Sequence, residues 1–396
     1  MVRSIRCNTI QYQLRNPILQ VTAGDKSGNR TATKLIRKVA GMESAGAVRT
    51  RNRAIAPLFV IAVLVLVPVS RASVGQNPSS GHTDAQSGKV ELLHVQGDVY
   101  MIAGAGANIT VQVGEEFVIV VDAGLPEKSQ DVLAAIRSVT DKHILYVIDT
   151  SADADHVGGN GNISRAGWAL PNTSRNPVVS DEEKFHVQTG ASIIAHINVL
   201  NRMSAPTGKV PLFPSALWPT DIYENKYWRL YNGEGVYIYH PSHAHTDGDS
   251  YVFFRRSDVI STGDIFTLAS YPVIKASQGG SVNGLIDALN QIIELLEPKA
   301  NEEGGTYVIP GHGPICDRHD VVEYRDMVTI IRGRIQYYIK QGMSLDAIKA
   351  ARPTLDYDGL YGATNGPWTT GMFIEAVYRE LSSGNTQQEQ KAGAGR

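Results

Sequence analysis

The segment 149–160 places three carboxylates, a histidine and two glycines within twelve positions. It follows an apolar run, residues 143–148, whose composition predicts a buried strand. Carboxylates crowded at a strand end repel one another, and burying them without cations or hydrogen bonds is costly. A divalent cation removes this cost, so the segment predicts a metal-binding loop. The alternative is a polar turn in which Asp155 caps the next helix and Gly158-Gly159 supplies flexible backbone.

Three further loops carry potential metal ligands directly after apolar runs. Residues 240–249 contain His245, residues 261–264 end in Asp264, and residues 310–314 contain His312. Side chains at the ends of separate strands can converge, so these loops are expected to meet the first one. Four such loops predict a metal centre. We interpret the other histidines, including His196, His240 and His243, as structural or supporting residues, and Cys316 as a buried thiol rather than a ligand.

The elements predicted around these loops follow a β-then-α pattern that occurs twice, which indicates a layered α/β domain. Strands are predicted at 90–95, 99–103, 108–113, 117–121, 143–149, 192–196, 236–240, 250–255, 259–262 and 306–310, and helices at 127–139, 197–203, 281–297, 320–340, 344–351 and 370–382. We expect a mobile hairpin tip at 104–107, a surface excursion at 163–189, and a proline-stiffened aromatic loop at 204–228.

On these motifs the chain resembles the metallo-β-lactamase superfamily of metallo-hydrolases, from about residue 90 to about residue 345. The resemblance implies a four-layer αββα sandwich, here with extra C-terminal helices, and a site at one edge between the two sheets. Matched by position, Asp155, His156 and His312 correspond to ligands of the family's second metal site. Asp264 corresponds to the carboxylate that bridges two metals, and His245 to a ligand of the first site.

The first metal site departs from the family pattern. Ser151 and Asp153 stand where the resemblance implies histidines, so two of the three expected imidazoles are missing. Serine is a poor zinc ligand, whereas Asp153 could complete an oxygen-rich site with His245 and Asp264. We therefore expect one Zn²⁺ bound tightly at the second site and a second ion bound weakly or not at all.

The resemblance implies hydrolysis of a small molecule, namely an ester, lactone, thioester, amide or β-lactam, by metal-activated water. The candidate catalytic residues are Asp153, Asp155 and His245, with Asp153 expected to accept the proton of the water and Asp247 as a weaker candidate base. Two alternatives remain open. The first alternative to a hydrolase is a catalytically degenerate metal-binding module that binds a ligand or partner. The second is an oxidoreductase that holds redox-active iron on the same fold.

Composition fits one large domain or two ordinary ones, since the chain has 396 residues of which 42% are hydrophobic. Residues 1–72 hold 12 of the 37 Lys and Arg residues and 2 of the 39 Asp and Glu residues. The remaining 25 basic and 37 acidic residues give the rest of the chain a net charge of −12. An acidic body argues against a nucleic-acid partner and is consistent with a small-molecule substrate.

The basic leader, residues 1–72, ends in an apolar run at 54–69 followed by Ser-Arg-Ala, which predicts an export signal cleaved after Ala72. The protein is then periplasmic or extracellular; an uncleaved membrane anchor is the alternative. A start at Met42 gives a leader of ordinary length. Residues 73–88 are predicted to be a disordered linker, 89–383 the folded domain, and 384–396 a polar tail. After cleavage only Cys316 remains of the two cysteines, so no intramolecular disulfide is expected.

Overall fold

The computed structural model describes residues 89–169, 190–207, 210–301 and 304–394, with side chains up to residue 383. The predictions for the leader and the linker fall on residues 1–88, which lie outside the described residues. Within the described ranges, no helix is both long enough and apolar enough to cross a membrane.

The first sheet has seven strands, with spatial order β1-β2-β3-β4-β5-β6-β9. The strands are β1 (Glu91–Gln96), β2 (Val99–Ala103), β3 (Ile109–Val113), β4 (Val118–Val121), β5 (Ile144–Ile148), β6 (Ser192–His196) and β9 (Asp221–Tyr223). Strands β1 to β4 form an antiparallel meander, whereas β4, β5, β6 and β9 run parallel to one another. The carboxyl ends of the parallel strands therefore lie at one edge of the sheet.

The second sheet has six strands in sequence order. They are β10 (Lys226–Tyr231), β11 (Glu234–Tyr239), β12 (Tyr251–Phe254), β13 (Val259–Ser261), β14 (Tyr307–Ile309) and β15 (Cys316–Asp317). Only the pair β13 and β14 is parallel within this sheet, so these two strands also end at a common edge. A separate small sheet pairs β7 (Pro206–Thr207) with β8 (Val210–Pro211).

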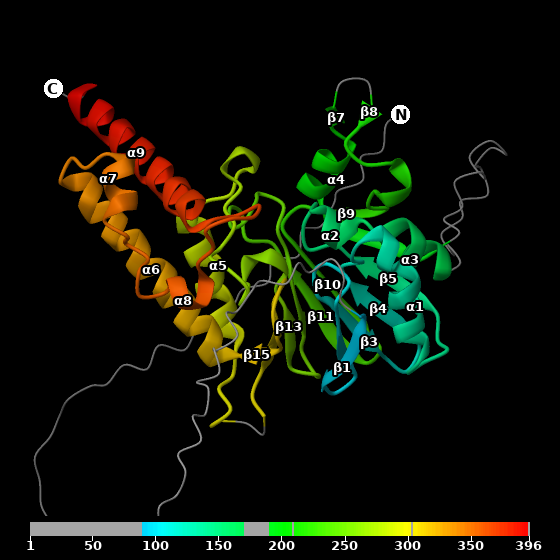
Figure 1. Ribbon diagram of the computed structural model, residues 1–396. Coiled ribbons are helices and arrows are strands. Elements are labelled where there is room, and N and C mark those ends of the chain that lie inside the picture. Colours follow the sequence, from blue (N-terminus) through cyan, green and yellow to red (C-terminus); the bar gives the residue numbers. More distant parts are fainter. Residues whose placement is uncertain (1–88, 170–189, 208–209, 302–303, 395–396) are drawn as a thin grey trace, which may run out of the picture. The chain divides into compact units, whose positions relative to one another are not determined.

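The helices fall into two sets that flank the sheets (Figure 1). They are α1 (Ser129–Arg137), α2 (Ala154–Val157), α3 (Asn160–Ala166), α4 (Ile197–Ser204), α5 (Val282–Leu295), α6 (Arg318–Lys340), α7 (Leu345–Ala350), α8 (Asp358–Tyr361) and α9 (Thr370–Ala394), with 3-10 turns η1 (Pro126–Lys128), η3 (Ser215–Leu217), η4 (Gly263–Ile265) and η5 (Ala276–Gln278). Helices α5 and α6 of the second set begin with side-chain caps, because Ser281 accepts from the backbone of α5 and Asp317 forms a capping box on α6.

Three buried clusters of apolar side chains define the layers. Val120 and Val147 of the first sheet pack with Val132 of α1 and Ile163 of α3, on the outer face of that sheet. A second cluster fills the space between the sheets, and includes Val121, Ile148, Ile238, Val252 and Ile309. A third packs the outer face of the second sheet against α5, α6 and α9, and includes Ile260, Val308, Leu289, Val328 and Phe373. The predicted four-layer αββα sandwich with extra C-terminal helices is confirmed.

Most predicted elements are present within a few residues of the expected bounds, but four predicted segments differ from the structure. Segment 104–107 is not a free tip, because Ala105 and Ala107 are fully buried. Segment 204–228 is not a single loop; β9 and the start of β10 add strands to both sheets. The surface excursion predicted at 163–189 overlaps the last residues of α3, and residues 170–189 lie outside the described ranges. Helix α9 continues to Ala394, past the predicted end at 382.

Candidate metal centre

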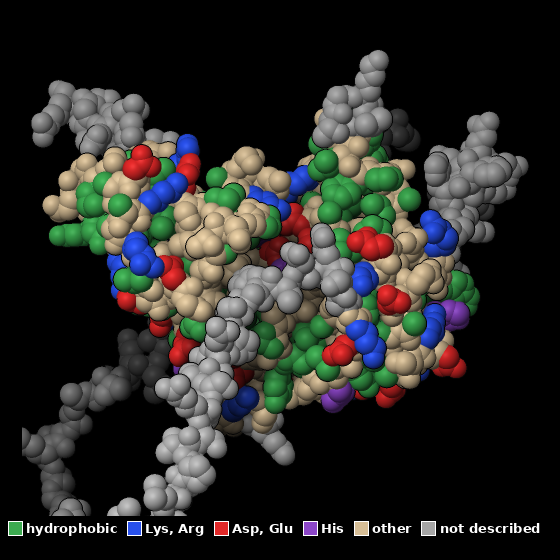
Figure 2. All heavy atoms as spheres, viewed as in Figure 1, with side chains coloured by type: hydrophobic (Ala, Val, Ile, Leu, Met, Phe, Trp, Pro, Cys, Tyr) green, Lys and Arg blue, Asp and Glu red, His purple; other side chains and the backbone are tan. Residues whose placement is uncertain are grey.

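The candidate site lies where loops leave the carboxyl ends of strands in both sheets. In the first sheet, β4 leads to Asp122 and β5 to the loop 149–157, and these strands are parallel neighbours. In the second sheet, β13 leads to Asp264 and β14 to His312, again from parallel neighbours. The long connection after β11 adds His245. Figure 2 shows acidic side chains gathered in a hollow of one face of the molecule, with Lys or Arg side chains at its edge.

The predicted ligands meet in two groups, each with ligand atoms within 4.8 Å of one another: Asp155, His156 and His312 in one group, and Asp153, His245 and Asp264 in the other. Asp264 faces both groups. Its Oδ1 lies 3.3 Å from His156 Nε2 and 3.5 Å from His312 Nε2, and its Oδ2 lies 3.8 Å from His245 Nε2. The structure therefore brings together six residues that are spread over more than 150 positions of the sequence.

The spacing in the second-site group fits a tetrahedral metal ion. Zinc bonds of about 2.0–2.1 Å place the ligands of a tetrahedral site about 3.4 Å apart. His312 Nε2 lies 3.3 Å from Asp155 Oδ2, close to the two distances from Asp264 Oδ1. Moreover, His156 Nε2 and Asp264 Oδ1 are buried and have no hydrogen-bond partner among the described residues. Buried polar atoms without partners are costly, and a shared divalent cation removes that cost.

A carboxylate that sequence analysis did not select orients His156. Asp122 Oδ2 lies 2.8 Å from His156 Nδ1, and the Asp122 carboxylate also accepts the backbone N–H of Thr150 at 2.8 Å. Asp122 is buried and holds a positive φ of 63°. With its Nδ1–H donating to Asp122, the ring directs Nε2 at Asp264, which is the orientation of a metal-ligating histidine. Its only sequence signal is an acidic residue directly after the strand predicted at 117–121.

The electrostatics of the second-site group favour a cation. Burial alone lowers the pKa of His156, but the negative charges of Asp122 and Asp264 and the hydrogen bond to Asp122 outweigh burial and raise it well above its usual value. Burial alone raises the pKa of Asp264, but His156, His312 and His245 lower it well below its usual value. A metal ion bound here must therefore displace protons from the histidines.

The first-site group is instead joined by hydrogen bonds. His245 Nε2 lies 2.8 Å from Asp153 Oδ2, while Lys275 Nζ donates to Asp153 Oδ1 at 2.5 Å. His245 Nδ1 contacts the carbonyl of Val273 at 2.6 Å. Burial opposes the charge on His245, but the Asp153 hydrogen bond and the carboxylates of Asp264 and Asp249 raise its pKa to about 9. Burial likewise opposes the charge on Asp153, but His245 and Lys275 lower its pKa below the usual range.

The alternative interpretation of Asp155 as a helix cap is wrong. Asp153 occupies the N-cap position of α2, and Asp155 lies inside the first turn. Asp153 makes no capping hydrogen bond, because its carboxylate binds His245 and Lys275. Ser151 is buried, and its hydroxyl accepts the backbone N–H of Asp153 at 3.2 Å, so this side chain supports the loop.

Two further acidic residues lie outside both groups. Asp149 is buried and accepts a hydrogen bond from Asn160 Nδ2 at 2.9 Å; burial raises its pKa well above the usual value. Asp247, the weaker candidate base, forms an ion pair with Arg202 at 2.5 Å. Of the three carboxylates in the loop 149–157, only two therefore contribute to the ligand groups.

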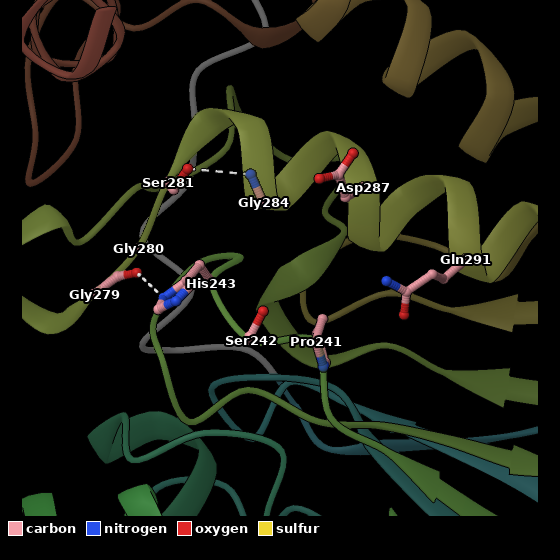
Figure 3. Close-up of a pocket in the computed structure, with 9 residues that line it drawn as sticks. All are labelled: Pro241, Ser242, His243, Gly279, Gly280, Ser281, Gly284, Asp287 and Gln291. Atoms are coloured by element: carbon pink, nitrogen blue, oxygen red, sulfur yellow. Dashed lines mark hydrogen bonds between the residues drawn. The ribbon is translucent and has the colours of Figure 1, made fainter. Parts of the chain in front are cut away.

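The remaining histidines of the site region have structural contacts, as predicted. His196 Nε2 contacts the carbonyl of Glu224 at 2.8 Å, and its ring stacks on His240 with centroids 3.6 Å apart. His243 contacts the carbonyl of Gly279 at 3.1 Å and lines a polar pocket beside the start of α5 (Figure 3). The ligand groups do not line this pocket. Cys316 is buried, and burial raises the pKa of its thiol.

Comparison with known proteins places this architecture in a family. The family model described as the metallo-beta-lactamase superfamily matches residues 103–312, which cover more than half of the chain. The chain belongs to the metallo-beta-lactamase superfamily. The matched residues contain the strands of both sheets from β3 to β14 and all six candidate ligands of the two groups. The metallo-beta-lactamase fold binds metal ions, usually zinc, and the superfamily includes hydrolases.

A solved structure shares the fold at low sequence identity. The stereoselective inverting sec-alkylsulfatase Pisa1 from Pseudomonas sp. superposes with a TM-score of 0.53 at 16% identity, covering 73% of this chain and 50% of that one. The chain thus spans about half the length of this structural relative. A metallo-beta-lactamase from Pontibacter korlensis gives a TM-score of 0.44 at 12% identity, covering 61% of this chain and 99% of that one. No curated protein matches the chain.

Proposed function

We propose that this member of the superfamily is a hydrolase with one tightly bound zinc ion, held by Asp155, His156, Asp264 and His312. One observation carries the proposal: the buried His156 Nε2 and Asp264 Oδ1 face each other at 3.3 Å without hydrogen-bond partners in the described part of the chain. The distances to His312 and Asp155 extend this ligand-like spacing to all four residues.

Zinc held by Asp155, His156, Asp264 and His312 would supply hydroxide at neutral pH and would polarise the bond under attack. The chain's own residues provide the rest. Asp122 fixes the ring of His156, and Asp264 faces the histidines of both groups. His245 holds a proton at pH 7, because its pKa is raised to about 9. Its two ring nitrogens bind Asp153 and the carbonyl of Val273, so the ring holds the Asp153 carboxylate in place. Asp153 is a weak proton acceptor in this arrangement, since its pKa is lowered.

The proposed substrates are small esters, lactones, thioesters, amides and β-lactams, which share a carbonyl group open to hydroxide. The basic leader and apolar run at 54–69 support the proposal that the protein is exported to the periplasm or beyond the cell. A secondary alkyl sulfate belongs in the same substrate panel, because a sec-alkylsulfatase shares the fold.

The test is hydrolysis of this panel by the purified full chain, loaded with zinc or with iron. We expect turnover of at least one class with zinc and its loss in Asp155→Ala, by about a hundredfold or more. Asp131→Ala is the matched control, because Asp131 is an exposed aspartate of α1 that belongs to neither ligand group.

Three results would reject the proposal in favour of an alternative. Turnover unchanged by Asp155→Ala would remove the site assignment. Bound metal without turnover of any class would favour a degenerate metal-binding domain. Redox activity that depends on iron and is absent with zinc would favour an iron oxidoreductase.

A further inference from the structure

Lys275 brings a positive charge to the position where the superfamily pattern implies a first metal ion. Its Nζ lies 2.5 Å from Asp153 Oδ1, and the other oxygen of the same carboxylate contacts His245 Nε2 at 2.8 Å. Both oxygens of Asp153 therefore already bind nitrogen atoms of the protein. The third residue of this group, Asp264, lies 3.8 Å from His245 through its Oδ2.

The backbone around Lys275 holds this arrangement in place. The N–H of Lys275 donates to the carbonyl of His245 at 3.0 Å, and the carbonyl of Val273 contacts the His245 ring at 2.6 Å. The carbonyl of Lys275 accepts from Gln278 and Gly280 at 2.8 and 3.0 Å. Residues 273–275 thus bind both the backbone and the ring of His245. These contacts fix the backbone of Lys275 beside the site.

The two groups differ in a way that follows from this contact. The second-site group keeps distances of 3.3–3.5 Å between ligand atoms, as the ligands of one ion require. In the first-site group, His245 and Asp153 are within hydrogen-bond distance, and an ammonium contacts the same carboxylate. A dication bound to Asp153 would be repelled by that ammonium at short range.

We propose that the Lys275 ammonium substitutes for the first metal ion, neutralising Asp153 beside His245 and restricting the chain to one metal ion. Lys275 acts as a positioning residue, because it contacts Asp153 rather than the second-site ligands. The inference deepens the proposed function, since it rests on a metal bound by Asp155, His156, Asp264 and His312. It also explains how a chain without the two expected histidines keeps Asp153 and His245 ordered at this position.

The experiment is zinc titration of the full chain, with bound equivalents measured by elemental analysis and the affinity of each equivalent by chelator competition. The wild-type protein is expected to bind one equivalent. Lys275→Met keeps the aliphatic part of the side chain and removes the charge. Its affinity for a second zinc ion is expected to exceed the weak affinity of the wild type for a second ion by at least about tenfold. Lys275→Gln is the second neutral variant, in case the methionine variant fails to fold.

Two matched variants test whether the charge is responsible. Lys275→Arg retains a cation and is expected to stay at one equivalent. Lys349→Met removes a lysine of similar exposure, 33% against 30%, from an ion pair with Glu375 away from the site, and is also expected to stay at one. Adding Asp153→Ala to Lys275→Met is expected to abolish the second equivalent, because the new ion needs that carboxylate.

The outcomes separate the two proposals. Two tight equivalents in the wild type, or one equivalent in both neutral variants, would overturn the role of Lys275 and leave the proposed second-site metal intact. Less than about half an equivalent in the wild type and in every variant would overturn the proposed metal site and this inference with it. One equivalent in the wild type and two in the neutral variants would support both.

Discussion

His156 Nδ1 lies 2.8 Å from Asp122 Oδ2, so a buried carboxylate fixes the ring whose other nitrogen faces Asp264. Asp122→Asn is expected to weaken zinc binding by about 10–100-fold, because a neutral amide lacks the negative charge with which the Asp122 carboxylate binds His156 Nδ1. Chelator competition measures the loss. Asp98→Asn, a change in an exposed ion pair with Arg256, is the control and should leave the affinity unchanged. Equal affinities in the wild type and Asp122→Asn would show that Asp122 does not support the metal.

Zinc binding is expected to release protons at pH 7. Burial opposes protonation of His156 and His312, yet the neighbouring carboxylates raise the pKa of both rings above the usual value. The metal-free rings therefore hold protons that zinc must displace, and the apparent affinity should increase as the pH rises through these pKa values. Calorimetry in buffers of different ionisation enthalpy measures the number released. No proton release at pH 7 would contradict the raised pKa values.

Gly311 is expected to be required for the position of Asp264. A Cβ at this position would lie 2.5 Å from Asp264 Oδ1 and 2.8 Å from the carbonyl carbon of Gly263, so Gly311→Ala must displace the loop. We expect Gly311→Ala to lose bound zinc while keeping the secondary structure seen by circular dichroism. Gly333→Ala is the control, since a Cβ there meets no atom within 4 Å. Full zinc occupancy in Gly311→Ala would show that the carboxylate tolerates the shift.

The ion pair of His245 and Asp153 predicts a pH-dependent stability of the metal-free protein. The pKa of His245 is raised to about 9 from its ordinary value of 6.5, so its contribution is complete below pH 6.5 and is lost as the pH rises through 9. The free energy of unfolding with chelator present should therefore exceed that of His245→Gln most at pH 6, by at most about 3 kcal/mol. A difference that grows between pH 6 and pH 10 would have the wrong sign.

Sequence patterns predicted the candidate ligands because each lies in a loop that follows an apolar strand and contains glycine. His245, Asp264 and His312 were found in this way, and the structure brings them to one edge. Strands β9 and most of β10 are among those that the sequence did not reveal, and they lie in a stretch rich in proline and aromatic residues. The prolines of segment 204–228 predict a loop. However, β9 pairs with β6 and β10 pairs with β11, and this pairing holds both segments in an extended conformation.

Residues that support the ligands carried no comparable signal. Asp122 and Lys275 are single charged residues in short turns, and their roles depend on contacts with residues 34 and 122 positions away in the sequence. The glycines of segment 104–107 predict a mobile hairpin tip. Instead the carbonyl of Asp155 accepts from Ala107, and that of Ala105 accepts from Leu125, which buries the turn against the metal loop. Such tertiary contacts override local composition.

The central claim is that a single metal ion binds at the second site, and metal content of three purified proteins tests it most directly. We predict about one equivalent of zinc in the wild type and in Asp153→Ala, but less than about a tenth of an equivalent in Asp155→Ala. Asp153 and Asp155 are two residues apart and belong to different ligand groups, so each variant controls for the other. Loss of zinc in Asp153→Ala with full occupancy in Asp155→Ala would contradict the account.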